Sequence, residues 1–295
     1  MADRMAQLLA AATLLLLPVT ASAAAAAAPP TFACTDIGPK PTTATIVGSN
    51  ANETITGTSG RDVIAGLGGD DTVDGGGGND LICGGDGNDR IAGGQGEDVL
   101  SGDAGDDVID GGTQPPHGGL DFIAYDASPA AVGASLATGK AVGWGTDQLI
   151  RIEGISGSPF ADTLAGDPRD NVLLGQRGND ALSGSRGSDL LSGTEGDDRL
   201  NGGAGADLAL YEHSPRPVRV DLSRGLARGW GRDRLRSIED VVGSAQPDRL
   251  YGGKGANYLW GLGGADYIDG RAGRDRAFGG PGPDRCVRVE VRSSC

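Results

Sequence analysis

Residues 57–110 read GTSGRDVIA, GLGGDDTVD, GGGGNDLIC, GGDGNDRIA, GGQGEDVLS and GDAGDDVID, six consecutive units of nine residues. Each unit, called a nonad below, has Gly at its first position, Asp at its sixth and a large aliphatic residue at its eighth. The sixth-position residues are Asp62, Asp71, Asp80, Asp89, Asp98 and Asp107, and Glu53 takes the same place one unit earlier. Copies in phase indicate a tandem-repeat protein rather than a chain with an ordinary core.

The pattern G-G-x-G-x-D-x-U-x, with U a large aliphatic residue, resembles the repeat of the RTX (repeat-in-toxin, hemolysin-type) calcium-binding family. The resemblance implies an all-β fold, a parallel β-roll or β-solenoid. The first six residues of a nonad would form a glycine-rich turn. The last three would form a strand, with position eight inward and positions seven and nine outward. Two nonads would make one coil, so that nonad n stacks on nonad n+2 about 4.8 Å away.

Stacking would place Asp62, Asp80 and Asp98 in one row and Asp71, Asp89 and Asp107 in the other, with Asp107 at the end of its row. Carboxylates at that separation repel by about 1 kcal/mol at the dielectric constant of water and by about 3–4 kcal/mol at an effective value of 20. A Ca²⁺ ion, which accepts six to eight oxygens, would reverse this repulsion. The resemblance implies that carboxylates of turns n and n+2, with turn carbonyls, surround each ion.

The nonads fall into three arrays, at 48–110, 157–210 and 243–287. The second array adds the expected ligands Asp162, Asp180, Asp189, Asp198 and Asp207, and the third adds Asp248, Asp266, Asp275 and Asp284. Asn171 and Asn257 supply an oxygen without a charge, which predicts weaker sites. Same-row pairs with Asp in both turns are 62/80, 71/89, 80/98, 89/107, 162/180, 180/198, 189/207, 248/266 and 266/284.

Charge differs among the arrays. The first holds 14 acids and 2 bases, the second 9 and 4, and the third 5 and 6, for net charges of −12, −5 and +1. We therefore expect the first array to bind more calcium, and more tightly, than the third. Five arginines lie close to the turns of the third array, which suggests that salt bridges replace ion sites there: Arg249, Arg271, Arg274, Arg276 and Arg285.

Two spacers, residues 111–156 and 211–242, match each other at an offset of 86 residues. The matches include Asp121 with Asp207, Tyr125 with Tyr211, Leu136 with Leu222, Gly139 with Gly225, Trp144 with Trp230, Asp147 with Asp233, and Ile152-Glu153 with Ile238-Glu239. Weak alternation around Thr138-Gly139 predicts a short hairpin. The two tryptophans are either a carbohydrate-stacking pair or, as we favour, structural anchors.

The 295-residue chain has 54 Gly and a formal net charge of −15. Glycine within a strand costs about 0.5–1 kcal/mol relative to alanine, so the chain needs an additional stabiliser. The negative charge disfavours nucleic acid and anionic membranes as partners and suits divalent cations.

Residues 1–23 are predicted to be a secretory signal peptide, with Arg4, the apolar stretch Leu8 to Val19, and the A-x-A site Ala21-Ser22-Ala23. Residues 24–47 would be a linker or cap. Pro18 interrupts the apolar run, which is too short to span a bilayer. A lipoprotein anchor at Cys34 is disfavoured by Phe32. We therefore expect a secreted, extracellular protein with no transmembrane segment in the mature chain.

In an exported protein the 4 Cys residues are expected to form two disulfides, because disulfides persist in oxidising compartments. Three pairings are possible, and we favour Cys34–Cys83 and Cys286–Cys295, which would close the two ends of the solenoid. Cys83 is at an outward ninth position and Cys286 at an inward eighth position. Residues 288–295 would form a C-terminal cap.

Catalytic motifs are absent from the sequence, which contains neither G-x-S-x-G nor H-E-x-x-H. RTX toxins, proteases and lipases carry a further domain ahead of their repeats, whereas only residues 24–47 precede the first nonad here. We expect a calcium-binding protein that is not an enzyme and whose Ca²⁺ ions drive folding. The alternatives are a calcium-stiffened adhesive or structural protein of the cell surface or matrix and, less favoured, an enzyme or an accessory to a cytolysin.

Overall fold

The computed structural model describes residues 44–113 and 119–295. Contacts divide the chain into two compact units after Ser158, and each unit is described by itself. The described residues form strands and turns without a helix, so none of their segments is a helix that could cross a membrane. The signal peptide, most of the predicted linker, and Cys34 lie outside the described residues.

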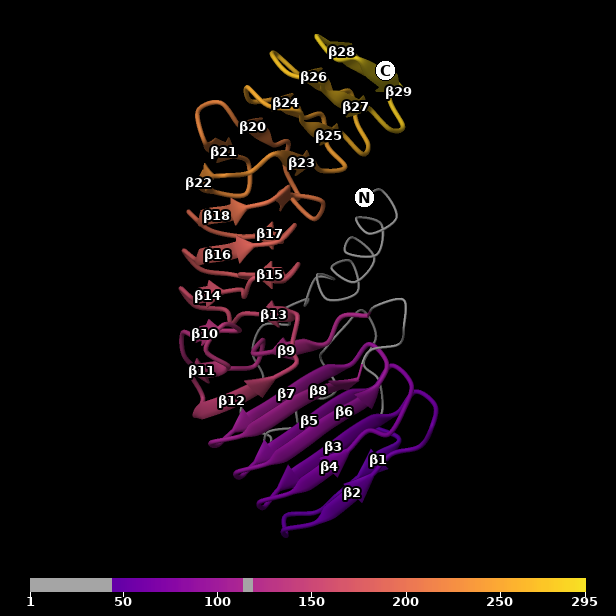
Figure 1. Ribbon diagram of the computed structural model, residues 1–295, viewed down its shortest axis with the longest axis vertical. Coiled ribbons are helices and arrows are strands. Elements are labelled where there is room, and N and C mark those ends of the chain that lie inside the picture. Colours follow the sequence, from indigo (N-terminus) through magenta and orange to yellow (C-terminus); the bar gives the residue numbers. More distant parts are fainter. Residues whose placement is uncertain (1–43, 114–118) are drawn as a thin grey trace, which may run out of the picture. The chain divides into compact units, whose positions relative to one another are not determined.

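The first unit consists of two sheets (Figure 1). Its A sheet runs in the order β1 (Ile46–Val47), β3 (Val63–Gly68), β5 (Leu81–Asp86), β7 (Val99–Ala104), β9 (Phe122–Ala124) and β13 (Gly154–Ser156). Its B sheet runs in the order β2 (Thr54–Thr56), β4 (Thr72–Asp74), β6 (Arg90–Gln95), β8 (Val108–Thr113), β12 (Thr146–Ile150), β11 (Lys140–Val142) and β10 (Gly133–Ser135).

The second unit repeats this arrangement. Its A sheet runs in the order β15 (Val172–Leu174), β17 (Leu190–Ser192), β19 (Leu208–Leu210), β23 (Asp240–Val242), β25 (Tyr258–Trp260), β27 (Arg276–Phe278) and β29 (Val291–Ser293). Its B sheet runs in the order β14 (Thr163–Ala165), β16 (Ala181–Arg186), β18 (Arg199–Ala204), β22 (Arg232–Arg236), β21 (Leu226–Arg228), β20 (Arg219–Asp221), β24 (Arg249–Tyr251), β26 (Tyr267–Asp269) and β28 (Arg285–Val287).

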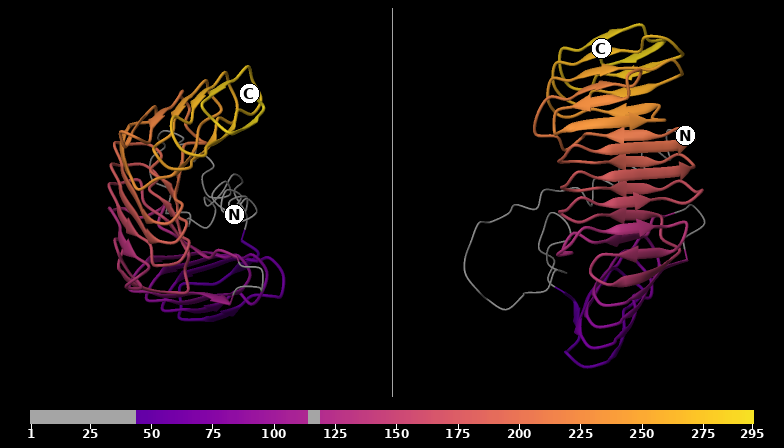
Figure 2. Two further views of the ribbon diagram at one scale, coloured as in Figure 1. Left: turned by 45° about the horizontal axis from the view of Figure 1, so that its top comes forward. Right: turned by 90° about the vertical axis from the view of Figure 1, so that its left-hand side faces the viewer.

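Strands in the arrays pair in parallel with residues 18 positions away, as Ile64 with Ile82 and Leu182 with Leu200. This register confirms that nonad n stacks on nonad n+2 and that the fold is a parallel β-solenoid; Figure 2 shows the stacked strands. The eighth-position side chains fill the interior between the two sheets. Ile64, Ile82, Leu100 and Ile109 are fully buried there. Each nonad therefore contributes one large apolar side chain to a narrow core.

The outward positions differ between the sheets. In the B sheet, β2 and β4 have exposed residues on both sides of the buried eighth position, as predicted. In the A sheet, all three residues of β15 (Val172–Leu174) are buried, and so are those of β17 and β19. Positions seven and nine, which were predicted to point outward, are therefore covered in these strands rather than exposed. Their near-continuous apolar sequences are typical of strands buried on both faces.

The spacers continue the solenoid. The predicted hairpin is confirmed: β10 and β11 are antiparallel, and Ala134 pairs with Ala141. The next strand, β12, then pairs in parallel with β8, which restores the stack. Gly145 must lack a side chain because its Cβ would lie 1.6 Å from the carbonyl oxygen of Gly105. Gly231 stands in the same relation to Gly196, which explains why the second Gly of Gly-Trp-Gly appears in both spacers.

The disulfide prediction is confirmed where the structure describes both cysteines. Cys286, in β28, is bonded to Cys295, with a Cα–Cα distance of 5.7 Å. Cys83 is also disulfide-bonded, and its predicted partner Cys34 lies outside the described residues. Cys83 is buried against Ala65, another ninth-position residue, with Ala44 and Leu67 packed beside them, so its outward position is covered rather than open to solvent.

The narrow core predicts a large cost for removing one eighth-position side chain. Leu200→Ala, at a residue that is 1 % exposed, should lower the unfolding free energy by about 2–5 kcal/mol at saturating calcium. Leu226→Ala, at a residue 43 % exposed, should change it by less than about 0.5 kcal/mol. Chemical denaturation followed by circular dichroism measures both, and equal losses would contradict a core built from one residue per nonad.

Candidate metal centre

The sixth-position acids lie at the last residue of each turn, directly before a strand. Within each predicted pair, the backbone N–H of the first Asp donates to Oδ1 of the Asp 18 residues later. All nine predicted pairs are brought together in this way, with N–O distances of 2.7–2.9 Å. Asn171 and Asn257 donate to Asp189 and Asp275 at 2.8 and 2.9 Å. One carboxylate oxygen per turn is thus fixed by the backbone.

The second oxygen of most of these carboxylates is buried without a donor in the described part of the chain. Twelve of the fifteen predicted ligands share this property: Asp71, Asp80, Asp89, Asp98, Asp107, Asp180, Asp189, Asp198, Asp207, Asp266, Asp275 and Asp284. An unsatisfied buried polar atom costs about 1–3 kcal/mol, and more when it is charged. Repetition of the same unsatisfied atom in row after row points to a missing cation rather than to isolated strain.

The first glycine of each nonad leaves room beside that oxygen. A Cβ on Gly75 would lie 2.6 Å from Oδ2 of Asp80 and 2.4 Å from the carbonyl oxygen of Gly93. A carboxylate oxygen of turn n and a carbonyl oxygen of turn n+2 therefore face the same small space. Ca²⁺ accepts both donor types at about 2.3–2.6 Å. The residues present fit the ion.

The candidate sites differ from side-chain clusters. In the described residues, no group of three or more His, Cys, Asp or Glu side chains converges on one point. Each space is lined instead by carboxylates of successive turns and by backbone carbonyls. Hard oxygen donors of this kind suit Ca²⁺ rather than Zn²⁺, which prefers nitrogen and sulfur ligands.

Burial raises the pKa values of the row carboxylates, and neighbouring carboxylates raise them further. The pKa is about 6 for Asp89 and Asp98, about 7 for Asp107, Asp189 and Asp198, and about 8 for Asp180. Without a cation, the folded chain therefore holds protons on these carboxylates at pH values where an ordinary Asp is ionised.

Comparison with protein families matches the RTX calcium-binding nonapeptide repeat at residues 47–82, 84–114, 156–191, 183–209, 242–277 and 251–285. These matches cover more than half of the chain. The chain belongs to this RTX repeat family. No curated protein matches the chain as a whole. Membership of the RTX family agrees with the fold, with the stacked aspartates and with calcium as the bound ion.

Two of the predicted ligands, Asp62 and Asp248, are exceptions. Oδ2 of Asp62 accepts hydrogen bonds from the backbone and hydroxyl of Thr58, at 2.6 and 2.8 Å. Ser244 donates to Asp248 in the same manner. A hydroxyl residue directly after the first glycine thus satisfies the acid. Asp62 and Asp248 are consequently weaker candidates than the other predicted ligands.

Sequence reasoning missed row members that lie in the spacers. The N–H of Asp98 donates to Asp121, that of Asp107 to Asp147, and that of Asp198 to Asp233. The expectation that Asp107 ends its row is therefore wrong. Spacing of 23, 35 or 40 residues hides these acids from a nine-residue period. The offset of 86 contained the signal, because it aligns Asp121 with Asp207, a sixth-position residue.

Two tyrosines satisfy the second oxygen of the spacer acids. The Tyr125 hydroxyl donates to Oδ2 of Asp147 at 2.8 Å, and the Tyr211 hydroxyl donates to Oδ2 of Asp233 at 2.9 Å. Burial and the adjacent carboxylate raise both tyrosine pKa values well above the usual one, so the hydroxyls remain donors. At Asp147 and Asp233, the tyrosine hydroxyl therefore donates to the second carboxylate oxygen, which has no donor in most of the preceding turns.

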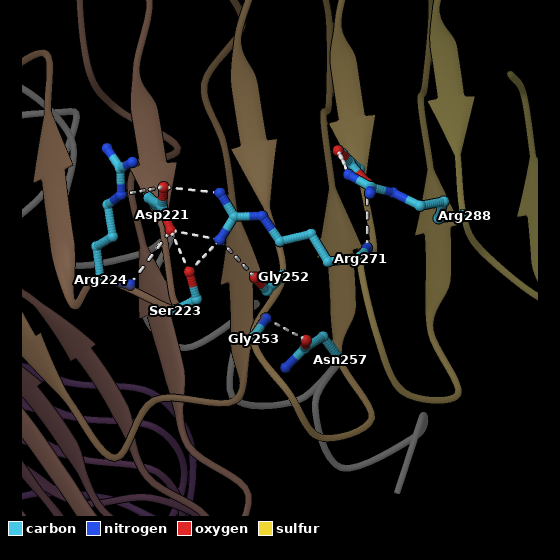
Figure 3. A network of polar contacts seen from close by, with 9 residues as sticks. Asp221, Ser223, Arg224, Gly252, Gly253, Asn257, Arg271 and Arg288 are labelled. Carbon is cyan, nitrogen blue, oxygen red and sulfur yellow. Dashed lines mark hydrogen bonds and ion pairs between the residues drawn. The ribbon is translucent and has the colours of Figure 1, made fainter.

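The arginines of the third array do not pair with the aspartate rows. Arg271 forms two hydrogen bonds with Asp221, at 2.7 and 2.8 Å, and Arg288 pairs with Asp269 (Figure 3). Asp221 and Asp269 occupy strand positions on the B sheet, whereas Asp266, Asp275 and Asp284 keep their unsatisfied oxygens. The suggestion that salt bridges replace the ion sites is therefore wrong for Arg271.

Filling one space tests the site geometry. A Cβ on Gly184 would lie 2.1 Å from Oδ2 of Asp189 and 2.6 Å from the carbonyl oxygen of Gly202. Gly184→Ala should therefore remove about one bound calcium ion, measured by equilibrium dialysis. Gly255→Ala is the matched control because nothing lies within 4 Å of its added Cβ. Equal calcium binding by both variants would show that the ion lies elsewhere.

The raised pKa values predict that a lower pH stabilises the calcium-free fold and weakens calcium binding. Acids whose folded pKa exceeds the unfolded value destabilise the calcium-free fold as pH rises through about 4 to 8, because the unfolded chain then binds fewer protons. Protons also compete with Ca²⁺ for the same oxygens. On going from pH 8 to pH 5.5, calcium affinity should fall while the β signal of the calcium-free chain rises. Titration calorimetry and circular dichroism measure these changes, and a calcium-free fold that is more stable at pH 8 would contradict the assignment.

Proposed function

We propose that this chain is a secreted calcium-binding protein whose β-roll folds when Ca²⁺ binds between stacked turns. The observation that carries the proposal is the row of twelve buried Oδ2 atoms, nine of which face a backbone carbonyl across the space left by a glycine. The ligands are the twelve aspartates with an unsatisfied Oδ2 and the predicted ligand Asp162, whereas Asp62 and Asp248, which accept hydrogen bonds from Thr58 and Ser244, contribute less. The N-terminal signal-like sequence supports secretion.

Extracellular calcium would supply the stabilisation that the glycine-rich chain lacks. Extracellular modules bind Ca²⁺ with dissociation constants of about 10⁻⁴–10⁻³ M. Ligand at ten times the dissociation constant adds about 1.4 kcal/mol per site. Several such sites together approach the whole stability of an ordinary domain, about 5–15 kcal/mol. Folding would thus be coupled to arrival in a calcium-rich compartment.

The direct test compares the purified chain with and without calcium. In chelator at pH 8 it should be largely disordered, and it should gain β signal cooperatively at millimolar Ca²⁺. Magnesium at the same concentration should not substitute, because it requires a tight octahedron and gives up its water reluctantly. Circular dichroism measures the change. Identical spectra in chelator and in calcium would refute calcium-driven folding.

A calcium-stiffened adhesive protein is the second candidate, and one observation favours it. Trp260 stacks on Phe278 with ring centroids 5.5 Å apart, and Tyr258 stacks on Trp260 at 5.6 Å. These half-buried aromatic rings form a continuous row along β25 and β27. If the row binds a surface partner, Trp260→Ala should weaken attachment to the producing cells without changing calcium binding. Attachment that survives this substitution would leave calcium binding as the only function supported.

A further inference from the structure

Three tripeptides take the place of a glycine-rich turn on the A sheets. They are Arg151-Ile152-Glu153, Ser237-Ile238-Glu239 and Arg288-Val289-Glu290. Each Glu immediately precedes an A strand, namely β13, β23 or β29. In the arrays this place belongs to the sixth-position Asp. The strand register therefore sets Glu153 opposite Asp121, Glu239 opposite Asp207 and Glu290 opposite Asp275.

The first residue of each tripeptide has an unusual backbone. Arg151, Ser237 and Arg288 have φ angles of 52°, 49° and 50°. Positive φ is uncommon for residues other than glycine and indicates a local constraint. Here it accompanies a particular direction of the carbonyl group. All three carbonyl oxygens point at a first-position glycine of the preceding coil.

These carbonyls recreate the space found in the arrays. A Cβ on Gly202 would lie 2.2 Å from the carbonyl oxygen of Ser237 and 2.4 Å from Oδ2 of Asp207. The corresponding distances are 2.3 and 2.5 Å at Gly111, to Arg151 and Asp121. At Gly270 they are 2.3 and 2.6 Å, to Arg288 and Asp275. In a regular turn, a Cβ on Gly75 would lie 2.4 Å from the carbonyl oxygen of Gly93 and 2.6 Å from Oδ2 of Asp80.

The glutamates supply the remaining carboxylate. Oε2 of Glu153 accepts the N–H of Asp121 at 3.2 Å, Oε2 of Glu239 accepts that of Asp207 at 3.1 Å, and Glu290 accepts that of Asp275. In the arrays, Oδ1 of an Asp accepts the corresponding N–H. The acid follows its carbonyl by two residues here and by five in a nonad. Because Glu has one methylene more than Asp, its carboxylate can reach the same N–H from a shorter loop.

An independent observation points to an ion at these turns. Asp207 is 0 % exposed and Asp275 is 1 % exposed, and Oδ2 of each is unsatisfied in the described residues. Each of these atoms faces the carbonyl of a short turn rather than of a glycine. A glutamate that only capped a backbone N–H would not require a carbonyl and a buried carboxylate oxygen to face one another.

We propose that the three tripeptides are compact calcium half-sites that complete ion sites with Asp121, Asp207 and Asp275. This inference rests on the proposed function, because it assumes that the aspartate rows bind Ca²⁺. It makes the spacers part of the ion-binding rows: the row 62, 80, 98 and 121 continues to Glu153 in the first unit. In the second unit, the row 189 and 207 continues to Glu239.

The test uses the full chain and Ca²⁺ as the probe. Glu153→Gln/Glu239→Gln keeps an oxygen that can accept the Asp N–H but removes the two charges. It should lose about two bound ions in equilibrium dialysis with metal analysis. The control Glu97→Gln/Glu195→Gln removes two exposed carboxylates and should bind as many ions as the unmodified chain. Equal stoichiometry and affinity in the two double variants would overturn the half-sites.

Two outcomes separate this inference from the proposed function. If the unmodified chain binds no calcium, the proposed function fails. If it binds calcium and the first double variant binds equally, only the half-sites fail. Should that variant not fold at saturating calcium, Glu290→Gln at the exposed last turn provides the same test, with an expected loss of about one ion. Ser237→Gly, which keeps the carbonyl and permits its φ, should keep every ion, and loss of an ion there would also count against the proposal.

Discussion

The structure depends on a conflict between buried oxygens. The backbone N–H of each row aspartate fixes one oxygen of the next carboxylate, and this places the second oxygen against a backbone carbonyl. Two acceptors cannot satisfy each other. The carboxylates lie almost completely buried, so bulk water does not solvate them. A divalent cation removes the conflict at neutral pH, because it accepts carboxylate and carbonyl ligands from two coils at once.

Glycine therefore has a second function beyond flexible turns. At the first position of a nonad, its φ is ordinary in most copies, and an L-residue could adopt the backbone conformation. The constraint is space, because a Cβ at Gly75 would occupy the region between Asp80 and Gly93. Later glycines such as Gly78, with φ of 110°, are required by conformation instead. The repeat thus combines one glycine that leaves room for an ion with others that shape the loop around it.

The nine-residue period, with the resemblance to RTX repeats, was sufficient to predict the parallel solenoid and its register, and it placed all fifteen predicted aspartates directly before strands, twelve of them with an unsatisfied second oxygen. The period could not predict the features that depart from it. Asp121, Asp147 and Asp233 rejoin the rows after insertions that break the period, and only the three-dimensional register brings them back. Hairpins account for the insertions before Asp147 and Asp233. The apolar sequences of β15, β17 and β19 were a sign that both faces are buried. The repeat pattern gives only the direction of each side chain, not whether other residues cover it.

In the third array, the net charge does not indicate which carboxylates are paired with arginine. Its net charge of +1 suggested that arginines had replaced calcium, but Arg271 and Arg288 pair with Asp221 and Asp269 on the strands. Arg288 is 61 % exposed, and ion pairs of that kind contribute about 0–1 kcal/mol. Such a pair adds less than one calcium ion at ten times its dissociation constant, about 1.4 kcal/mol. Arg271 and Arg288 therefore neutralise strand aspartates, while Oδ2 of Asp266, Asp275 and Asp284 has no donor in the described residues.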